Sequence, residues 1–190
     1  MRIMAVDLSV SCTGVAFPDG DTMAVKSRAT GDERRFQITE HVEIAARACK
    51  ADLVMIEGLG GVYKGEAARE IPMLHGAVRL ALRRSFIPFM RDVSPSSLKK
   101  FATGNGNADK DRMREAAARL LGKRYATPDE CDADWLRLAG LVAYGRPLTG
   151  LDGALTDAQV RTLFFNSSGK PIAWPDVTTP DGLHRPKIPA

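Results

Sequence analysis

Two acidic residues each close a short apolar run: Asp7 ends the stretch 2–7 and Glu57 ends the stretch 53–57. Both runs are too short for a helix, so each predicts a buried strand whose last residue is a carboxylate. A carboxylate in that position is costly to desolvate and normally has a strong partner. Where two strands of one sheet both end in an acid, a hard cation such as Mg²⁺, with Mn²⁺ as a substitute, is a fitting common partner.

A third carboxylate is expected from a helix predicted over about 130–144. Its apolar residues recur at spacings of four, three and four and define one buried face: Cys131, Trp135, Leu138 and Val142. Asp134 lies toward that face, so we expect it to point at the sheet and join the two strand-end acids. Asp129, Glu130 and Asp132 lie at the rim or before the helix, where helix capping or a first-turn acid is an equal alternative. Three convergent carboxylates favour an oxygen-liganded ion over zinc.

The elements that must position these acids follow from periodicity and turn residues. We expect strands over 2–7, 14–17, 22–26, 53–57 and 86–93, and helices over 32–50, 66–84, 95–101 and 109–121, with Pro72 kinking or breaking the second helix. This order predicts an α/β fold with a mixed five-stranded sheet flanked by helices. The first and fourth strands would lie side by side and parallel, which brings Asp7 and Glu57 together.

The last quarter of the chain has a different composition. After Pro147 it becomes rich in Pro and Gly, with one short helix expected over 156–164 and an extended or disordered tail over 166–190. We therefore predict a domain over residues 1–146 and a C-terminal extension over 147–190.

Composition excludes several classes of protein. The chain has 190 residues, 44% hydrophobic and 26% charged, and no apolar run near the roughly 20 residues that span a bilayer. The start lacks a signal-peptide core, and three scattered cysteines indicate reduced thiols, so we expect a cytoplasmic protein with no membrane partner.

The charged residues are unevenly distributed along the chain. Residues 94–124 carry eight Lys/Arg against three acids, and residues 125–160 carry six acids against two Arg. A basic segment beside an acidic one suits a phosphate-holding surface next to a metal site.

Four pieces of the chain together resemble the RuvC-type Holliday-junction resolvases, nucleases with an RNase H-like fold. They are residues 6–14 (Val-Asp-Leu-Ser through Thr-Gly), 54–58 (Val-Met-Ile-Glu-Gly), 95–110 (Pro-Ser-Ser-Leu-Lys-Lys through Ala-Asp-Lys) and 132–139 (Asp-Ala-Asp-Trp-Leu-Arg-Leu-Ala). They occur in family order over roughly residues 1–145. The resemblance implies a homodimer that nicks opposed strands of a four-way DNA junction by Mg²⁺-dependent hydrolysis, in recombination and repair.

The resemblance also implies roles for individual residues. Carried over by position, Asp7, Glu57 and Asp134 become metal ligands. The family's fourth acid sits three residues before the last one, where this chain has Cys131, a poor Mg²⁺ ligand. Asp132 then becomes the candidate fourth acid, although a neighbouring acid or a three-acid site stays open. Lys110 becomes a catalytic-site or phosphate contact, and the residues expected to hold the DNA are Lys99, Lys100, Arg112 and, as an aromatic entering the junction, Tyr63.

Two other functions compete with this hypothesis. If Cys131 has disabled the site, the chain would be a protein that binds junctions or branched DNA with weak or no cleavage. A phosphotransferase of the actin and sugar-kinase type also opens with an acidic strand end and a hairpin. Such proteins need a second phosphate-binding hairpin and a larger, duplicated chain, and this sequence shows no internal repeat.

The predicted interface of a dimer is the helix 66–84, with Met73, Leu74, Val78 and Leu82, although that face suits the core equally well.

Overall fold

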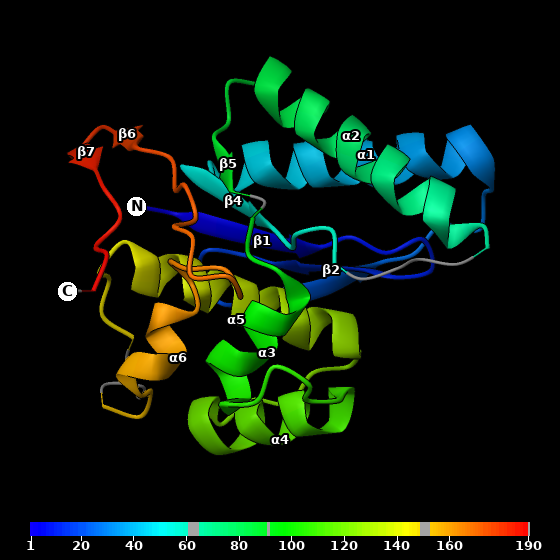
Figure 1. The fold of residues 1–190 in the computed structure, drawn as a ribbon. Helices are drawn as coiled ribbons and strands as arrows, with labels where there is room; N and C mark the ends of the chain where they lie inside the picture. Colours follow the sequence, from blue (N-terminus) through cyan, green and yellow to red (C-terminus); the bar gives the residue numbers. More distant parts are fainter. Residues whose placement is uncertain (61–64, 91, 149–152, 190) are drawn as a thin grey trace.

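The computed structural model describes residues 1–60, 65–90, 92–148 and 153–189, and builds them around a five-stranded sheet in the order β3-β2-β1-β4-β5 (Figure 1). In the centre, β1 (Ile3–Asp7) pairs antiparallel with β2 (Thr13–Ala16) and parallel with β4 (Leu53–Ile56). At the edges, β3 (Thr22–Val25) pairs antiparallel with β2, and β5 (Phe89–Met90) pairs parallel with β4. The predicted mixed sheet, with parallel first and fourth strands, is confirmed.

Helices cover both faces of this sheet. On one face lie α1 (Gly31–Ala48) and α2 (Ala67–Arg84); on the other lies α5 (Pro128–Ala143), with α3 (Pro95–Thr103), α4 (Lys110–Leu121) and α6 (Asp157–Arg161) outside it (Figure 1). Side chains alternate across a strand, so β1 feeds both layers. Ile3 and Ala5 join the core beneath α5, whereas Met4 and Val6 join the core beneath α1 and α2.

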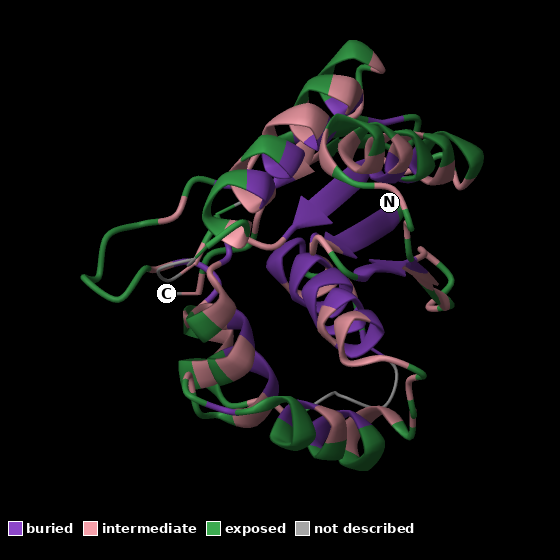
Figure 2. Cartoon of the chain, turned by 90° about the vertical axis from the view of Figure 1, so that its right-hand side faces the viewer, coloured by how far each residue is buried: buried purple, intermediate pink, exposed green. Residues whose placement is uncertain are grey.

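Helix α5 is buried on nearly all sides, as Figure 2 shows. The face that carries Trp135 turns away from the sheet: its indole Nε1 donates a hydrogen bond to the Met113 carbonyl oxygen of α4 at 3.3 Å, and its ring meets Phe101 of α3 edge-on. The opposite face lies on the sheet. A Cβ on Gly140 would come within 3.0–3.1 Å of Met55 and Ile3, so a larger residue there would require these side chains to shift by a few tenths of an ångström.

Local sequence signals set the helix starts. Ser94, Asp109 and Thr127 each accept a backbone hydrogen bond at the start of α3, α4 and α5. Helix α2 continues past Pro72 to Arg84, so the proline does not break it. The proline lies in the second turn of that helix, and its missing N–H removes one hydrogen bond without ending the helix.

The strand expected over 86–93 is much shorter in the structure, where β5 comprises Phe89 and Met90 alone. The end of α2 accounts for the lost residues. Phe86 adopts a left-handed conformation with φ of 56°, and the N–H of Ile87 donates to the Leu82 carbonyl oxygen at 2.9 Å. These residues close the helix, so the strand starts only after them.

The C-terminal extension is more structured than its composition suggested. The expected tail contains a hairpin of β6 (Val177–Thr179) and β7 (Gly182–His184), and the predicted helix over 156–164 shortens to α6. Trp174 packs against Tyr144 and Phe164 and donates a hydrogen bond to the Leu163 carbonyl oxygen at 2.8 Å. These aromatic contacts join the extension to the core beneath α5.

None of the helices in the described residues has the length and apolar character to cross a bilayer.

Candidate active site

The strand pairing brings Asp7 and Glu57 to the same edge of the sheet. Val6 of β1 pairs with Ile56 of β4, and the next residue on each strand is the acid. The N–H of Glu57 donates to the Val6 carbonyl oxygen at 3.3 Å, so the ladder holds the two backbones together up to the acids themselves. Parallel strands end at one edge, which is where open α/β sheets place their sites.

The first turn of α5 lies directly against this edge. Gly14 of β2 pairs with Asp7, and a Cβ on Gly14 would lie 2.0 Å from the carbonyl oxygen of Asp129. Only a glycine therefore allows the start of α5 to approach β2 so closely. Asp129 and Asp132 are three residues apart, so both side chains lie on the same side of this turn.

The electrostatics of Asp7, Glu57 and Asp132 show that their carboxylates share one environment. Burial, followed by the charges of Asp132 and Asp129, raises the pKa of Asp7 to about 8. Burial and the charges of Asp7 and Asp132 raise the pKa of Glu57 well above its usual value. Burial is also the main cause that raises the pKa of Asp132 to about 6. Acids collected at a cost in desolvation and mutual repulsion are typical of functional sites.

Two lysines partly offset this negative charge. Lys110, the first residue of α4, donates from Nζ to Asp129 Oδ1 at 3.4 Å, and its charge lowers the pKa values of Asp7, Glu57 and Asp132. Lys99 of α3 acts in the same direction on Glu57 and Asp132. The side chain of Lys110 is 62% exposed, so it can contact an incoming phosphate while it faces the acids.

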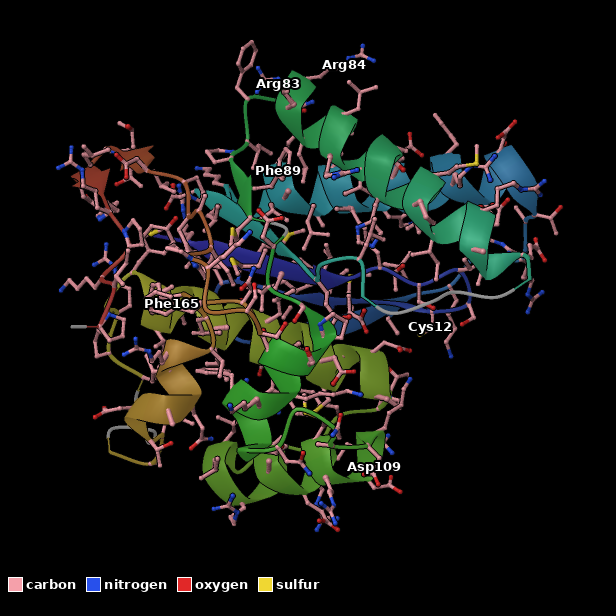
Figure 3. The ribbon with its side chains drawn as sticks, in the orientation of Figure 1. Cys12, Arg83, Arg84, Phe89, Asp109 and Phe165 are labelled. Carbon is pink, nitrogen blue, oxygen red and sulfur yellow. The ribbon has the colours of Figure 1, made fainter. Side chains whose placement is uncertain are left out.

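The structure gives less information on the other predicted DNA contacts. Lys100 and Arg112 are exposed on α3 and α4, and neither is among the charges that act on the acid group. Asp109, which caps α4 just before Lys110, lies with Cys12 at the right-hand end of the molecule in Figure 3, the end toward which β1 runs. Tyr63 lies outside the described residues.

Asp134 is placed wrongly by the sequence prediction. It is fully buried, but its carboxylate accepts hydrogen bonds from Lys123 Nζ at 2.9 Å and Tyr125 Oη at 2.7 Å, and from Arg137 Nε at 2.7 Å. Trp135, on the apolar face used to orient the helix, packs on α3 and α4 and not on the sheet. Asp134 therefore points to a separate cluster beside the turn between β2 and β3, where Lys123 Nζ also donates to the Gly20 carbonyl oxygen at 2.8 Å.

Asp129 is an acid that the sequence prediction left open but did not choose. The expected spacing of three residues between the last two acids was counted back from Asp134 and therefore reached Cys131. Counted back from Asp132, the same spacing reaches Asp129, which lies beside Asp7 and Lys110. Cys131 is buried in the core beneath α5 and takes no part in this group. The spacing of three residues is therefore present in the sequence, but it ends at Asp132 and not at Asp134.

The two neighbours of Asp129 have other tasks. Glu130 forms a capping box: its carboxylate accepts from the Thr127 N–H at 2.8 Å, and the Thr127 hydroxyl accepts from the Glu130 N–H at 3.2 Å. Cys12 lies beside Asp129, and burial together with its hydrogen bond to Asp129 raises the pKa of the thiol. A protonated thiol is neither a nucleophile nor a metal ligand, so these residues frame the site without adding to its chemistry.

The donor set fits a hard divalent cation by its chemistry. Asp7, Glu57, Asp129 and Asp132 offer only carboxylate oxygens, the ligands that Mg²⁺ and Mn²⁺ prefer. A divalent cation would offset the repulsion among these carboxylates. In the part of the chain that the structure describes, no three His, Cys, Asp or Glu side chains already converge on one point as a metal cluster.

Comparison with known proteins adds an independent line of evidence, although no family model matches the chain. It is 28% identical over 159 residues to the crossover junction endodeoxyribonuclease RuvC of Nocardia farcinica, which covers 78% of this chain and 84% of that protein. The RuvC of Gloeobacter violaceus is 29% identical over 150 residues, covering 73% and 86% of the two chains. The structure of Thermus thermophilus RuvC superposes with a TM-score of 0.61 at 19% identity, over 78% of this chain and all of that one.

The chain is therefore similar to RuvC-type resolvases in sequence over about three quarters of its length, and similar to them in fold. The fold likeness extends to Thermus thermophilus RuvC in complex with a Holliday junction substrate, with a TM-score of 0.60 over 73% of this chain and 91% of that one. The mixed five-stranded sheet flanked by helices is the RNase H-like arrangement expected for RuvC-type proteins.

Proposed function

We propose that the chain is a Mg²⁺-dependent crossover junction endodeoxyribonuclease that resolves four-way DNA junctions by paired phosphodiester hydrolysis. The observation that carries this proposal is the group of Asp7, Glu57, Asp129 and Asp132 at one sheet edge, with Lys110 and Lys99 beside it. The names of the relatives agree with this chemistry. We place the activity in the bacterial cytoplasm, where the three free cysteines would stay reduced.

Asp7, Glu57, Asp129 and Asp132 would hold the cations through their carboxylate oxygens. Bound divalent ions supply activation of a water nucleophile and charge compensation at the scissile phosphate. The acids orient these ions and, once their repulsion is offset, remain ionised at neutral pH. Hydrolysis then needs no covalent enzyme intermediate. In the described residues around the acids we find no nucleophile with an adjacent base: Ser9 and Ser11 bond each other, and Cys12 keeps its proton.

The basic residues of α3 and α4 would hold the DNA backbone. Lys110 reaches the acids and extends into solvent, so it is suited to the scissile phosphate, and Lys99 lies on the same side. Lys100 and Arg112 would contact phosphates farther along the strand. Phosphate contacts fix the position of a protein on DNA without reading its sequence, which suits recognition of a branch. Tyr63 remains our candidate for the aromatic contact at the junction centre.

Paired nicks require two sites, and we assign the second to a second copy of the chain. The helix α2 was the predicted interface, but Leu74, Val78 and Leu82 lie in the core, whereas Met73 is 46% exposed. Four of the nine large hydrophobic residues that are exposed in the described part of the chain lie on α1 and α2: Phe36, Ile44, Met73 and Leu80. Phe36 and Leu80 line a groove of about 500 Å³ between the two helices, and this surface supports a homodimer.

Purified protein incubated with labelled four-way junction, linear duplex and single strand tests the activity, with and without Mg²⁺. We expect symmetric nicks in the junction alone, and only with the metal. Binding without cleavage in Mg²⁺ and Mn²⁺ would leave a junction-binding protein, and equal cleavage of linear duplex would remove the structure selectivity.

Sedimentation of the wild type and Leu80→Glu tests the dimer separately. We expect the wild type to sediment as a dimer and the variant as a monomer, because a buried charge at an apolar interface costs several kcal/mol. The monomer should bind junctions yet lose paired nicking. Arg83→Glu, a charge change at an exposed position of the same helix, serves as the control. A wild-type monomer on and off the junction would contradict the assignment.

A further inference from the structure

A cavity of about 500 Å³ lies where the C-terminal extension meets the end of α5, and the proposed cleavage chemistry does not use it. Its walls come from residues 144–146, which follow α5, and from residues 183–187, in and after β7. In Figure 1 this region lies at the left, near both termini, whereas the acids lie at the end toward which β1 runs. Helix α5 separates the two regions, and its 16 residues at 1.5 Å each span about 24 Å.

The charged side chains in the described walls of this cavity are all basic. They are Arg146, Arg185 and Lys187, and none of the lining residues that the structure describes is an Asp or Glu. Arg185 pairs with Asp176 at 3.4 Å, but both side chains are largely exposed and such a pair is weak. Within the described residues, neither Arg146 nor Lys187 forms an ion pair with an acid. The cavity therefore gathers positive charge that the surrounding protein leaves largely uncompensated.

The end of α5 does not need these cations as hydrogen-bond donors. Lysine and arginine near a helix end often bond the last carbonyl groups. Here the last four carbonyl oxygens already accept backbone N–H groups at 2.7–3.2 Å: Gly140 from Tyr144, Leu141 from Arg146, Val142 from Gly145 and Ala143 from Lys187. Gly145 has a φ of 62°, the left-handed conformation that closes many helices in this way. The basic side chains are thus left to bind another group.

Arg146 is held in position by a neutral partner. Its Nη2 donates to Nδ1 of His184 at 3.1 Å, and the Thr179 hydroxyl oxygen lies 2.8 Å from Nε2 of the same ring. That hydroxyl donates to the Gly182 carbonyl oxygen at 3.5 Å, so it accepts from Nε2. Nε2 therefore carries the ring proton, and Nδ1 is free to accept from the guanidinium group. A neutral imidazole orients the guanidinium group without cancelling its charge.

The charge and size of the cavity favour a ligand that carries phosphate groups. A carboxylate brings one negative charge to these cations, whereas neighbouring phosphate groups bring two or more. Arginine also matches phosphate geometry, because its fixed fork donates to two oxygens at once. The volume of about 500 Å³ lies within the roughly 300–1,000 Å³ of small-ligand sites and exceeds what one phosphate fills. Leu183, which is 53% exposed, offers an apolar surface for a sugar or a base.

We propose that this cavity is a phosphate-binding site separate from the candidate active site, and that it takes a ligand with at least two phosphate groups. Arg146 is the main contact, and Lys187 and Arg185 complete the positive wall. A DNA strand that leaves the junction and a free nucleoside diphosphate both present this chemistry. The DNA source rests on the proposed function, whereas the site itself does not, because none of its residues belongs to the acid group.

Titration calorimetry with pyrophosphate tests the site itself. The full-length protein is used in buffer with a chelator, so that no divalent ion links the ligand to the acids. We expect Arg146→Ala to weaken pyrophosphate binding by about tenfold or more, because it removes charge-assisted hydrogen bonds. Lys187→Ala, at an exposed position, should weaken binding in the same direction and does not depend on the fold tolerating the first change. Arg83→Ala removes the same charge from the exposed end of α2 (Figure 3) and should bind as the wild type does.

The salt dependence of junction binding separates the two sources of phosphate, again without divalent ions. A span of about 24 Å corresponds to about seven nucleotides at 3.4 Å each. If DNA occupies the cavity, Arg146→Ala should lower the slope of log affinity against log salt by about one unit for longer arms, and should leave it unchanged for shorter ones. Weaker pyrophosphate binding with unchanged slopes would support the site and assign it to a free nucleotide.

Two results would overturn the proposal. One is that neither pyrophosphate binding nor the salt slope responds to Arg146→Ala or Lys187→Ala. The other is a glutamate-rich peptide that binds the wild type more tightly than pyrophosphate does, which would make the cavity a site for an acidic protein segment. Neither result depends on cleavage, so a protein that fails to cut junctions leaves the test intact.

Discussion

Two acids of helix α5, Asp132 and Asp134, differ in how the charge of the carboxylate is balanced. Asp134 is fully buried and its two oxygens receive three donors, from Lys123, Tyr125 and Arg137. Asp132, two residues earlier, faces other acids, and its pKa rises to about 6, mainly through burial. Asp134 has its full set of partners within the protein, whereas the charge of the acids around Asp132 is only partly offset by Lys110 and Lys99. The balance of charge, and not burial alone, therefore separates a structural acid from a candidate catalytic one.

The largest expected effect is the loss of cleavage when a member of the unbalanced group is neutralised. Asp7→Asn should lower the rate of junction cleavage by about 10³-fold or more, since the ion it helps to hold contributes several kcal/mol to transition-state stabilisation. Junction affinity, measured by gel shift, should stay within about twofold because the basic surface is intact. Asp129→Asn should behave in the same way. An Asp129→Asn protein as active as the wild type would reduce the group to three acids.

Asp134→Asn should produce the opposite pattern. The change leaves Lys123 and the buried guanidinium of Arg137 without their acid, and breaking such a pair costs about 3–5 kcal/mol. For a domain of this size we expect the melting temperature to fall by roughly 6–20 °C. Below the transition, cleavage per folded molecule should remain close to that of the wild type. Lost cleavage with an unchanged melting temperature would return Asp134 to the active site.

Asp7→Asn should also raise the stability of the metal-free protein at neutral pH. Between pH 4 and about pH 8 the unfolded chain ionises Asp7 while the folded chain keeps its proton, so the wild type loses stability as the pH rises through this window. The variant lacks this loss, and its melting temperature at pH 7.5 should exceed that of the wild type by a few degrees. The difference should vanish below pH 4, where both chains are neutral at this position. A variant that melts below the wild type at pH 7.5 would show that the acids are not in conflict.

A smaller effect is expected for Lys110→Met, which removes the cation that faces both the acids and solvent. Junction affinity should fall by a few-fold, and the slope of log affinity against log salt should decrease by about one unit, as expected when one phosphate contact is lost. Arg83→Met, at the other end of α2 from the loop that follows Glu57, is the matched control and should leave the slope unchanged. An unchanged slope for Lys110→Met would limit this lysine to balancing the acids.

Much of the fold was predictable because local patterns specify it. The apolar runs that end in Asp7 and Glu57 became β1 and β4 in parallel register, and the caps at Ser94 and Asp109 start α3 and α4. Prediction failed where neighbours in space override local preference. The strand expected over 86–93 is shortened by the left-handed turn at Phe86. The tail folds as a hairpin because Trp174 finds partners in the core that its own sequence does not announce.

For the candidate site, the sequence by itself determined that Asp7 and Glu57 end neighbouring strands, since both the strands and their ends are local features. The sequence also determined that a basic segment over residues 94–124 precedes the acidic start of a helix. Only the tertiary structure decided which acids of α5 meet them. That helix is buried on nearly all sides, so its apolar stripe does not reveal which face lies on the sheet. The close approach of Asp129 to Gly14 and of Gly140 to Ile3 fixes that face, and it turns Asp129 and Asp132 toward Asp7 and Asp134 away.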